Sequence, residues 1–263
     1  MNKKINKSKE WLQQQIAIGR SRRDMGKELG VEVGTLTRWA KRLGLRITTP
    51  PTRTRRYNVN HHYFDIINTE TKAYALGLIS TDGCIDKYGW QLKISINKQD
   101  ADVLDIIQQD MQSECPIGKT KDGRRSLAIY SIDITKGLNK YGIVNNKTFT
   151  CPFIELPTKI LTLHYIRGAI DGDGSIGTKK RSVRFVTASE SFMFGFYNWY
   201  LRTYGKRCYV GIEPGINIPK YRFVFGSRDK QFIEDLYKNA HIYMKRKYSN
   251  YLKNWISVNK LRK

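Results

Sequence analysis

The feature that most constrains the fold of this chain is an internal repeat. Residues 75–85 read ALGLISTDGCI and residues 166–176 read IRGAIDGDGSI. An ungapped offset of 91 residues matches five identical pairs of positions, among them Gly77 with Gly168, Asp82 with Asp173 and Gly83 with Gly174. Each copy is an apolar segment of helical length that ends in the turn dipeptide Asp-Gly. Two such copies in one chain predict two related halves and a pseudo-symmetric fold.

The two repeated aspartates are the first candidates for a functional site. Gly77 and Gly168 lie five residues before them, and glycines at these positions allow two helices to pack closely. Each aspartate then lies at a helix C-terminus, where the negative end of the helix dipole disfavours a carboxylate. Asp82 and Asp173, held side by side, would repel each other unless cations lie between them. We therefore expect a divalent-cation site, with Mg²⁺ suited to oxygen ligands and phosphate chemistry; the alternative is that both aspartates are ordinary turn residues.

The charge of the chain indicates the kind of partner that it binds. There are 47 Lys+Arg against 23 Asp+Glu, a formal net charge of +24, and residues 1–56 alone hold 15 of the former and 4 of the latter. Such an excess is typical of nucleic-acid-binding proteins, because basic side chains displace the counterions condensed on phosphates. A merely basic protein, or one that binds acidic membrane surfaces, is the alternative. No apolar run approaches the roughly 18 residues of a membrane span, and no signal-peptide pattern follows the first lysines, so we expect an intracellular protein without membrane contact.

The N-terminal part of the chain has the pattern of a small DNA-reading domain, which we place at residues 1–48. Ser21 is a favourable N-cap for a helix that reads RRDMGKEL, and Gly30 lies where a tight turn needs a positive φ. A second helix reads TLTRWAKRL and ends at Gly44. This spacing is similar to that of a helix-turn-helix, with a plain amphipathic hairpin of helices as the alternative. Outward side chains of the second helix are expected to contact DNA; they are Thr35, Thr37, Arg38, Lys41 and Arg42.

A basic linker is expected at residues 49–62. This stretch contains a Pro-Pro pair and no hydrophobic period, which favours an extended segment without a core of its own. Its arginines suit the phosphate backbone or a minor groove, and we expect DNA contacts from Arg53, Arg55 and Arg56.

Beyond the linker, helices and β-hairpins are expected to alternate. Residues 90–97 read WQLKISIN, in which every second residue is apolar, so a half-exposed strand is expected. Further hairpins are expected at 115–132, 176–187 and 206–226, and helices at 101–112 and 190–203, the last with an aromatic stretch that packs in the core. Exposed faces and hairpin tips are expected to contact DNA through Gln91, Lys93, Ser95, Lys179, Lys180, Arg181, Arg184 and Arg222. An antiparallel sheet with one solvated face and no DNA partner would show the same alternation.

The two Asp-Gly helices, each followed by strands, resemble the LAGLIDADG homing endonuclease family over about residues 63–263. The resemblance implies an α+β fold of two αββαββα repeats, 63–150 and 151–263, whose saddle-shaped sheets straddle double-stranded DNA. It also implies that Asp82 and Asp173, with the backbone oxygens of Thr81 and Gly172, hold Mg²⁺ ions, for which Mn²⁺ would substitute.

The same resemblance implies a lysine near each scissile phosphate and a polar residue that positions water at the end of the second strand of each repeat. Lys147 in KYGIVNNKT fits the lysine position of repeat 1, and Lys247 in MKRKY fits that of repeat 2, although Lys245 and Arg246 are adjacent. Asn97 fits the water-positioning place in repeat 1. Repeat 2 has Ala188 at the matching position, which departs from the family pattern.

Taken together, these patterns predict a monomeric, metal-dependent endonuclease that cuts both strands of a long, specific DNA site. Hydrolysis would proceed by in-line attack of activated water, without a covalent enzyme intermediate. Two alternatives remain open: a DNA- or RNA-binding protein of the same fold, such as a regulator or an intron maturase, and a nickase with one working half. The genetic context (intron, intein or free-standing gene in a phage) also stays open.

Overall fold

The computed structural model describes residues 9–17, 20–47, 57–179, 181–213 and 219–256. The chain divides into two compact units, Met1–Arg56 and Tyr57–Lys263. None of the described helices is long and apolar enough to cross a membrane.

The first unit consists of three helices in its described part, α1 (Lys9–Ala17), α2 (Arg22–Leu29) and α3 (Val33–Arg42). The Ser21 hydroxyl accepts a hydrogen bond from the backbone N–H of Asp24 at 3.1 Å, so it caps α2 as predicted. Gly30 follows α2 in the left-handed region, with φ of 65°. A Cβ at Gly26 would lie 2.8 Å from the carbonyl oxygen of Val31, so only glycine allows this close turn. The α2–turn–α3 geometry therefore has the form that the spacing predicts, although its role as a DNA reader stays a prediction.

The core of this unit and the exposed face of α3 follow the predicted helical period. Leu12, Met25 and Leu36 are fully buried. The five residues that we expected to face outward are all exposed; they are Thr35, Thr37, Arg38, Lys41 and Arg42. The predicted contacts Arg53, Arg55 and Arg56 lie outside the described residues.

The second unit contains two copies of the same element order. The first copy is α4 (Glu70–Asp82), β1 (Gly83–Ile85), β2 (Gln91–Ile96), α5 (Asp102–Asp110), β3 (Ile117–Lys119), β4 (Arg125–Tyr130) and α6 (Ile132–Asn139). The second copy is α7 (Lys159–Asp173), β5 (Gly174–Ile176), β6 (Val183–Thr187), α8 (Glu190–Tyr204), β7 (Tyr209–Glu213), β8 (Lys220–Phe225) and α9 (Lys230–Tyr237), and α10 (Lys245–Tyr251) follows it. Both copies read αββαββα, which confirms the predicted α+β fold.

The two sheets also have the same strand topology. Their strand orders are β1-β2-β4-β3 and β5-β6-β8-β7, and all the pairs are antiparallel. In the first hairpin Gly83 pairs with Ile94, and in the second Gly174 pairs with Phe185. These pairs are related by the same 91-residue offset as the repeat, so the duplication extends from the sequence to the strand register.

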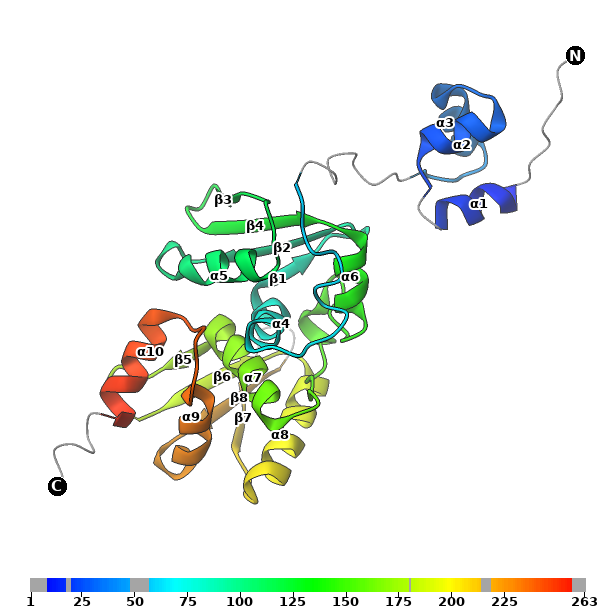
Figure 1. The fold of residues 1–263 in the computed structure, drawn as a ribbon. Helices are drawn as coiled ribbons and strands as arrows, with labels where there is room; N and C mark the ends of the chain where they lie inside the picture. The colour runs from blue at the N-terminus through cyan, green and yellow to red at the C-terminus, as the bar shows by residue number, and fades with distance from the viewer. Residues whose placement is uncertain (1–8, 18–19, 48–56, 180, 214–218, 257–263) are drawn as a thin grey trace, which may run out of the picture. The chain divides into compact units, whose positions relative to one another are not determined.

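Helices α4 and α7 lie against each other at the centre of this unit, with one sheet on each side (Figure 1). Each sheet turns its apolar face to the core, as Leu92, Ile94 and Ile96 do on β2. Most of the aromatic stretch of α8 is core, as predicted, with Phe192, Phe196, Trp199 and Tyr200 buried, whereas Phe194 is exposed.

The linker prediction needs a correction at its C-terminal end. We expected residues 49–62 to be a linker, but the chain from Tyr57 onward belongs to the second unit. The side chains of Tyr57 and Val59 pack against the core, and the backbone N–H of Asn58 donates to the Glu114 carboxylate at 3.1 Å. The proline and arginine content of this stretch gave no sign of these contacts, because they involve residues far along the chain.

Candidate active site

Two glycines determine how closely the central helices approach. A Cβ added to Gly77 on α4 would lie 1.9 Å from the carbonyl oxygen of Tyr165. On α7, a Cβ at Gly168 would lie 2.1 Å from the carbonyl oxygen of Tyr74. Both distances are impossible for real atoms, so the two backbones meet where both repeats have glycine. The close packing that the repeat predicts is confirmed.

The same packing brings the C-termini of α4 and α7 together. A Cβ at Gly172 would lie 1.9 Å from the Thr81 hydroxyl oxygen and 3.2 Å from Oδ2 of Asp82. Asp82 therefore borders the residue that precedes Asp173. Burial raises the pKa of Asp82 above its usual value, and the charge of Asp173 raises it further. Burial also raises the pKa of Asp173. The expected pair of mutually repelling carboxylates is present at the ends of the two helices.

Lys147 lies beside this pair from repeat 1. Its side chain is buried, and its ammonium group donates a hydrogen bond to the carbonyl oxygen of Gly83, the residue that follows Asp82. Burial lowers the pKa of Lys147, whereas the nearby carboxylates of Asp173 and Asp82 act in the opposite direction.

Lys247, at the start of α10, occupies the matching place in repeat 2. Only 3% of this residue is exposed, and its ammonium group donates to the carbonyl oxygens of Ile170 at 2.8 Å, Asp171 at 2.5 Å and Gly174 at 2.7 Å. Burial lowers the pKa of Lys247 to about 8. Gly174 matches Gly83 in the repeat, so the two lysines bind equivalent carbonyl groups although the spacing from aspartate to lysine differs between the copies.

The basic residues next to Lys247 have other partners. Lys245 forms an ion pair with Asp102 at 2.9 Å, and Arg246 forms one with Asp100 at 2.9 Å. Of the three adjacent cations, Lys247 is thus the one that reaches the motif helix. Its selection from the sequence agrees with the geometry, while its chemical role remains a prediction.

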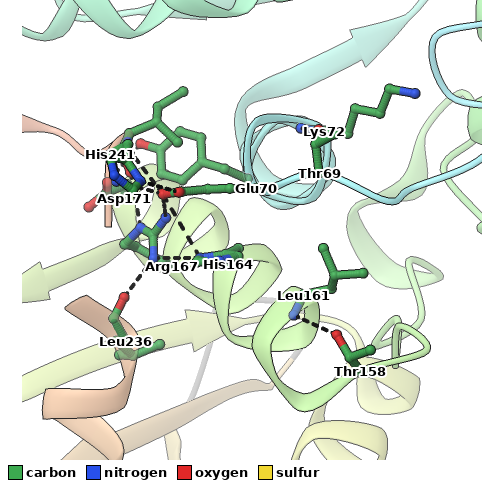
Figure 2. A network of polar contacts seen from close by, with 12 residues as sticks. Thr69, Glu70, Lys72, Thr158, Leu161, His164, Arg167, Asp171, Leu236 and His241 are labelled. Atoms are coloured by element: carbon green, nitrogen blue, oxygen red, sulfur yellow. Dashed lines mark hydrogen bonds and ion pairs between the residues drawn. The ribbon is translucent and has the colours of Figure 1, made fainter. Parts of the chain in front are cut away.

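A buried polar network joins α7 to α4 and to the chain that precedes Lys247. Figure 2 shows Glu70, Arg167, Asp171 and Leu236 of this network. Arg167 on α7 is fully buried and donates to Oε1 of Glu70 on α4 at 2.5 Å, to the carbonyl oxygen of Leu236 at 2.7 Å and to that of Ile242 at 3.0 Å. The Asp171 carboxylate accepts from the Tyr74 hydroxyl at 2.7 Å and from the backbone N–H of Met244 at 2.8 Å. These bonds attach the chain just before α10 to both central helices. Sequence reasoning did not find this network, because the arginine and the aspartate looked like ordinary parts of the repeat.

A pocket of about 310 Å³ opens beside Asp173. Its lining includes Lys147, Thr81 and Lys220, and also Ala188, the position where repeat 2 departs from the expected polar residue. In repeat 1 the corresponding Asn97 has a local role, because its side-chain oxygen accepts a hydrogen bond from the backbone N–H of Gln99 at 3.0 Å and caps a short 3-10 turn. The proposed role of Asn97 in positioning water therefore stays a prediction.

The two motif carboxylates suit a divalent cation that takes few of its ligands from the protein. Among the described residues, no group of three or more His, Cys, Asp or Glu side chains gathers in a way that could hold a metal ion. Mg²⁺ is commonly held by one or two carboxylates, together with water and substrate phosphate oxygens. Asp82 and Asp173 provide such a pair. The carbonyl groups of Thr81 and Gly172 belong to the last turns of α4 and α7, where carbonyls have no partner inside the helix, so they suit the backbone ligands expected from the sequence.

The predicted DNA contacts on the sheets divide into two groups. Lys93, Arg184 and Lys179 are exposed, as a phosphate contact requires, and Gln91 and Ser95 are partly buried on the same face of β2 as Lys93. Two arginines have protein partners that were not expected: Arg181 donates to the carbonyl oxygen of Asn254 at 2.8 Å, and Arg222 forms an ion pair with Glu213 at 2.7 Å. Lys180 lies outside the described residues.

Two basic residues beside the aspartates were missed. A guanidinium nitrogen of Arg124 lies 3.5 Å from Oδ1 of Asp82. The charge of Lys220 acts to lower the pKa of Asp173, against the larger effect of burial. Neither residue follows a recognisable motif. The register of the second hairpin in each repeat could have identified them, but a sequence does not give that register.

Comparisons with known proteins give structural likeness only. No protein-family model and no curated protein matches the sequence. Solved structures with a similar arrangement include mesophilic variants of the homing endonuclease I-DmoI, at 14% identity and a TM-score of 0.48, covering 72% of this chain and 97% of that one. The homing endonuclease I-WcaI bound to its DNA recognition sequence has 15% identity and a TM-score of 0.47, covering 69% of this chain and 86% of that one. I-SmaMI bound to uncleaved DNA target in the presence of calcium ions has 14% identity and a TM-score of 0.49, covering 74% of this chain and 91% of that one. The function proposed below depends on the geometry of this chain's own aspartates and lysines.

Proposed function

We propose that this chain is a metal-dependent endonuclease that cuts both strands of a specific double-stranded DNA site and acts as a monomer. The observation that supports it most strongly is the pair of motif aspartates at the ends of two glycine-packed helices, each with a buried lysine at an equivalent carbonyl group. Two half-sites in one polypeptide suit two cuts by one chain. The net charge of +24 suits a polyanionic substrate.

The residues of the site have separable roles in this proposal. Asp82 and Asp173 hold divalent cations, with backbone oxygens of Thr81 and Gly172 as further ligands. Bound Mg²⁺ would supply Lewis-acid stabilisation of the phosphate and activation of water, and Mn²⁺ suits the same oxygen ligands. Lys147 and Lys247 place positive charge where negative charge develops on the phosphate. Burial keeps bulk water away from both ammonium groups, which strengthens their effect.

The first test is cleavage of a random-sequence DNA library by the purified chain with Mg²⁺, followed by sequencing of the cut ends. We expect one dominant site, cut on both strands, and no cutting by the Asp82→Asn/Asp173→Asn double variant. Full activity of the double variant would refute the endonuclease assignment. Specific binding without any cutting would favour a regulator or maturase of the same fold, and cutting of one strand only would favour a nickase.

We further propose that α2 and α3 read DNA as a helix-turn-helix beside the main site. The support is the capped α2, the glycine turn and the exposed basic face of α3. Arg38→Ala and Arg42→Ala should each weaken binding and shorten the protected region of DNA on one side. Lys27→Ala on the exposed face of α2 is the matched control. An unchanged footprint in both α3 variants would mean that this unit does not read DNA.

A further inference from the structure

Arg124 and Lys220 occupy equivalent positions in the two repeats. Ile94 on β2 pairs with Leu127 on β4, and Phe185 on β6 pairs with Phe223 on β8. Ile94 and Phe185 are matched by the 91-residue offset, so the strands make Leu127 and Phe223 equivalent as well. Three residues before each of them is a cation, Arg124 in one repeat and Lys220 in the other. The sequence offset at these two positions is 96, which hides the match from an ungapped alignment.

Each of these cations lies next to the motif aspartate of its own repeat. Arg124 approaches Oδ1 of Asp82 at 3.5 Å, and Lys220 lines the same pocket as Asp173 and Lys147. A guanidinium has five N–H donors, so this one contact with Asp82 leaves Arg124 donors for another anion. Lys220 is exposed and Arg124 is half-buried with 43% of its side chain accessible, whereas Lys147 and Lys247 are buried.

A purely structural role explains Lys220 poorly. Its cross-strand partner on β7 is Glu213, but that carboxylate forms its ion pair with Arg222 at 2.7 Å. Within the described part of the chain, Lys220 has no carboxylate at ion-pair distance. An exposed cation at the rim of a pocket that also contains a carboxylate and a buried lysine is placed to bind an anion that enters the pocket.

We propose that Arg124 and Lys220 form a matched pair of phosphate-binding side chains, one at each motif aspartate, which hold the two DNA backbones at the positions of cleavage. The placement of these side chains at the positions of cleavage rests on the proposed endonuclease function, whereas phosphate binding rests on geometry alone. Arg124 can bind a phosphate through two parallel N–H donors, whereas Lys220 acts as a point charge. Their exposure means that they meet DNA directly, ahead of the buried lysines.

Phosphate binding is tested by titrating a labelled duplex, carrying the sequence that the chain enriches from a random library by binding, in EDTA at several salt concentrations. Arg124→Gln and Lys220→Gln should each lower the slope of log affinity against log salt by about 0.9, the value for one lost phosphate contact. Lys238→Gln removes the same charge from an exposed position after α9 and lines a different hollow, so it is the matched control. Unchanged slopes in both test variants would overturn the proposal.

Placement at the two cleavage positions is tested by strand-resolved cleavage with Mg²⁺. Each variant should slow one strand by about tenfold or more, the effect of one charged hydrogen bond, and the two variants should slow opposite strands. Arg124→Lys should cut faster than Arg124→Gln but more slowly than the wild-type chain, because lysine restores the positive charge without the bidentate hydrogen bonding of a guanidinium. Equal slowing of both strands by each variant would overturn the pairing. If the wild-type chain cuts nothing, the endonuclease proposal fails while the salt slopes still decide whether these residues bind phosphate.

Discussion

The two half-sites hold their lysines in different ways. Lys247 of repeat 2 binds three carbonyl groups, and the chain before it is attached by Arg167 and Asp171. The offset places Leu76 and Ser80 at the corresponding positions of α4, so repeat 1 has no counterpart of these charges. Lys147 still reaches the equivalent carbonyl group of Gly83. The two repeats therefore reach the same backbone arrangement of the site with different buried side chains around it, while the motif glycines, aspartates and lysines are common to both.

This difference has an electrostatic consequence. The charges of Asp171 and Asp100 favour the charged form of Lys247, but burial outweighs them and lowers its pKa to about 8. Burial also raises the pKa of Asp171. In repeat 1 the neighbours of Lys147 include the Cys84 and Cys151 thiols, and burial again lowers its pKa. Both halves thus place a lysine ammonium group against a motif helix in a buried position, where it loses its hydration.

The largest expected effect comes from the residues that the halves have in common. Asp82→Asn and Asp173→Asn should each reduce cleavage of at least one strand by about 10³-fold, since metal-ion stabilisation is worth several kcal/mol. Specific binding in EDTA should survive, because the carboxylates repel DNA rather than attract it. Strand-resolved cleavage and gel-shift titration check both points. If either variant cuts both strands at the wild-type rate, that half-site does not depend on its aspartate.

The second prediction concerns the glycines on which both halves depend. Gly77→Ala and Gly168→Ala should each lower the free energy of unfolding by about 3 kcal/mol, because the new methyl group meets a backbone carbonyl that no rotamer change can move. Chemical denaturation of the full chain measures the loss. Gly118→Ala on β3, whose Cβ would meet only one atom at 4.0 Å, is the control and should change little. Similar stabilities of all three variants would mean that α4 and α7 are packed less closely than the glycines indicate.

The third prediction uses the pKa of Lys247 to distinguish the halves. If Lys247 acts as a cation, cleavage of the strand that it serves should fall as pH rises through about 8, because the ammonium group loses its proton. Lys247→Met should slow that strand by about 10²-fold and remove this pH dependence. Strand-resolved rates between about pH 7 and 9 measure it, with the exposed Lys245→Met as the control. A flat profile for both strands would contradict a cationic role.

Unfolding does not explain such a loss of rate. The folded-state pKa of Lys247 lies below the ordinary lysine value of 10.5, so the unfolded chain binds more protons between these two values. Where the unfolded state binds more protons, stability rises with pH. This group therefore favours folding more strongly over the range in which its catalytic contribution falls, and a denaturation curve at pH 9 separates the two effects.

The repeat made the fold and the centre of the site predictable, because each conclusion depended on local pattern. Gly77 and Asp82 recur at a fixed spacing, and the strand after them alternates, so helix packing and the apolar face of that strand were predictable. Arg124 and Lys220 were not predictable in this way, since their places depend on how β2 pairs with β4 and how β6 pairs with β8. The ion pair of Arg222, a predicted DNA contact, with Glu213 on the neighbouring strand was likewise not apparent from the sequence. Contacts set by tertiary structure rather than by spacing are the ones that the sequence left open.

The smallest expected effect comes from a position beside the pocket where repeat 1 has a hydrogen-bonding side chain and repeat 2 has none. Ala188 lines the pocket beside Asp173 and cannot position a water molecule, whereas Asn97 has a polar side chain at the matching place. We expect the poorer half to be slower rather than inactive, so cleavage of supercoiled plasmid should pass through a nicked form. Ala188→Gln should shorten the lifetime of that form by roughly fivefold, the effect of one hydrogen bond of about 1 kcal/mol, and Ala188→Met, of similar length, should not. A time course from supercoiled to linear plasmid without an open-circular species would show that both strands are cut together, and that another group holds the water in repeat 2.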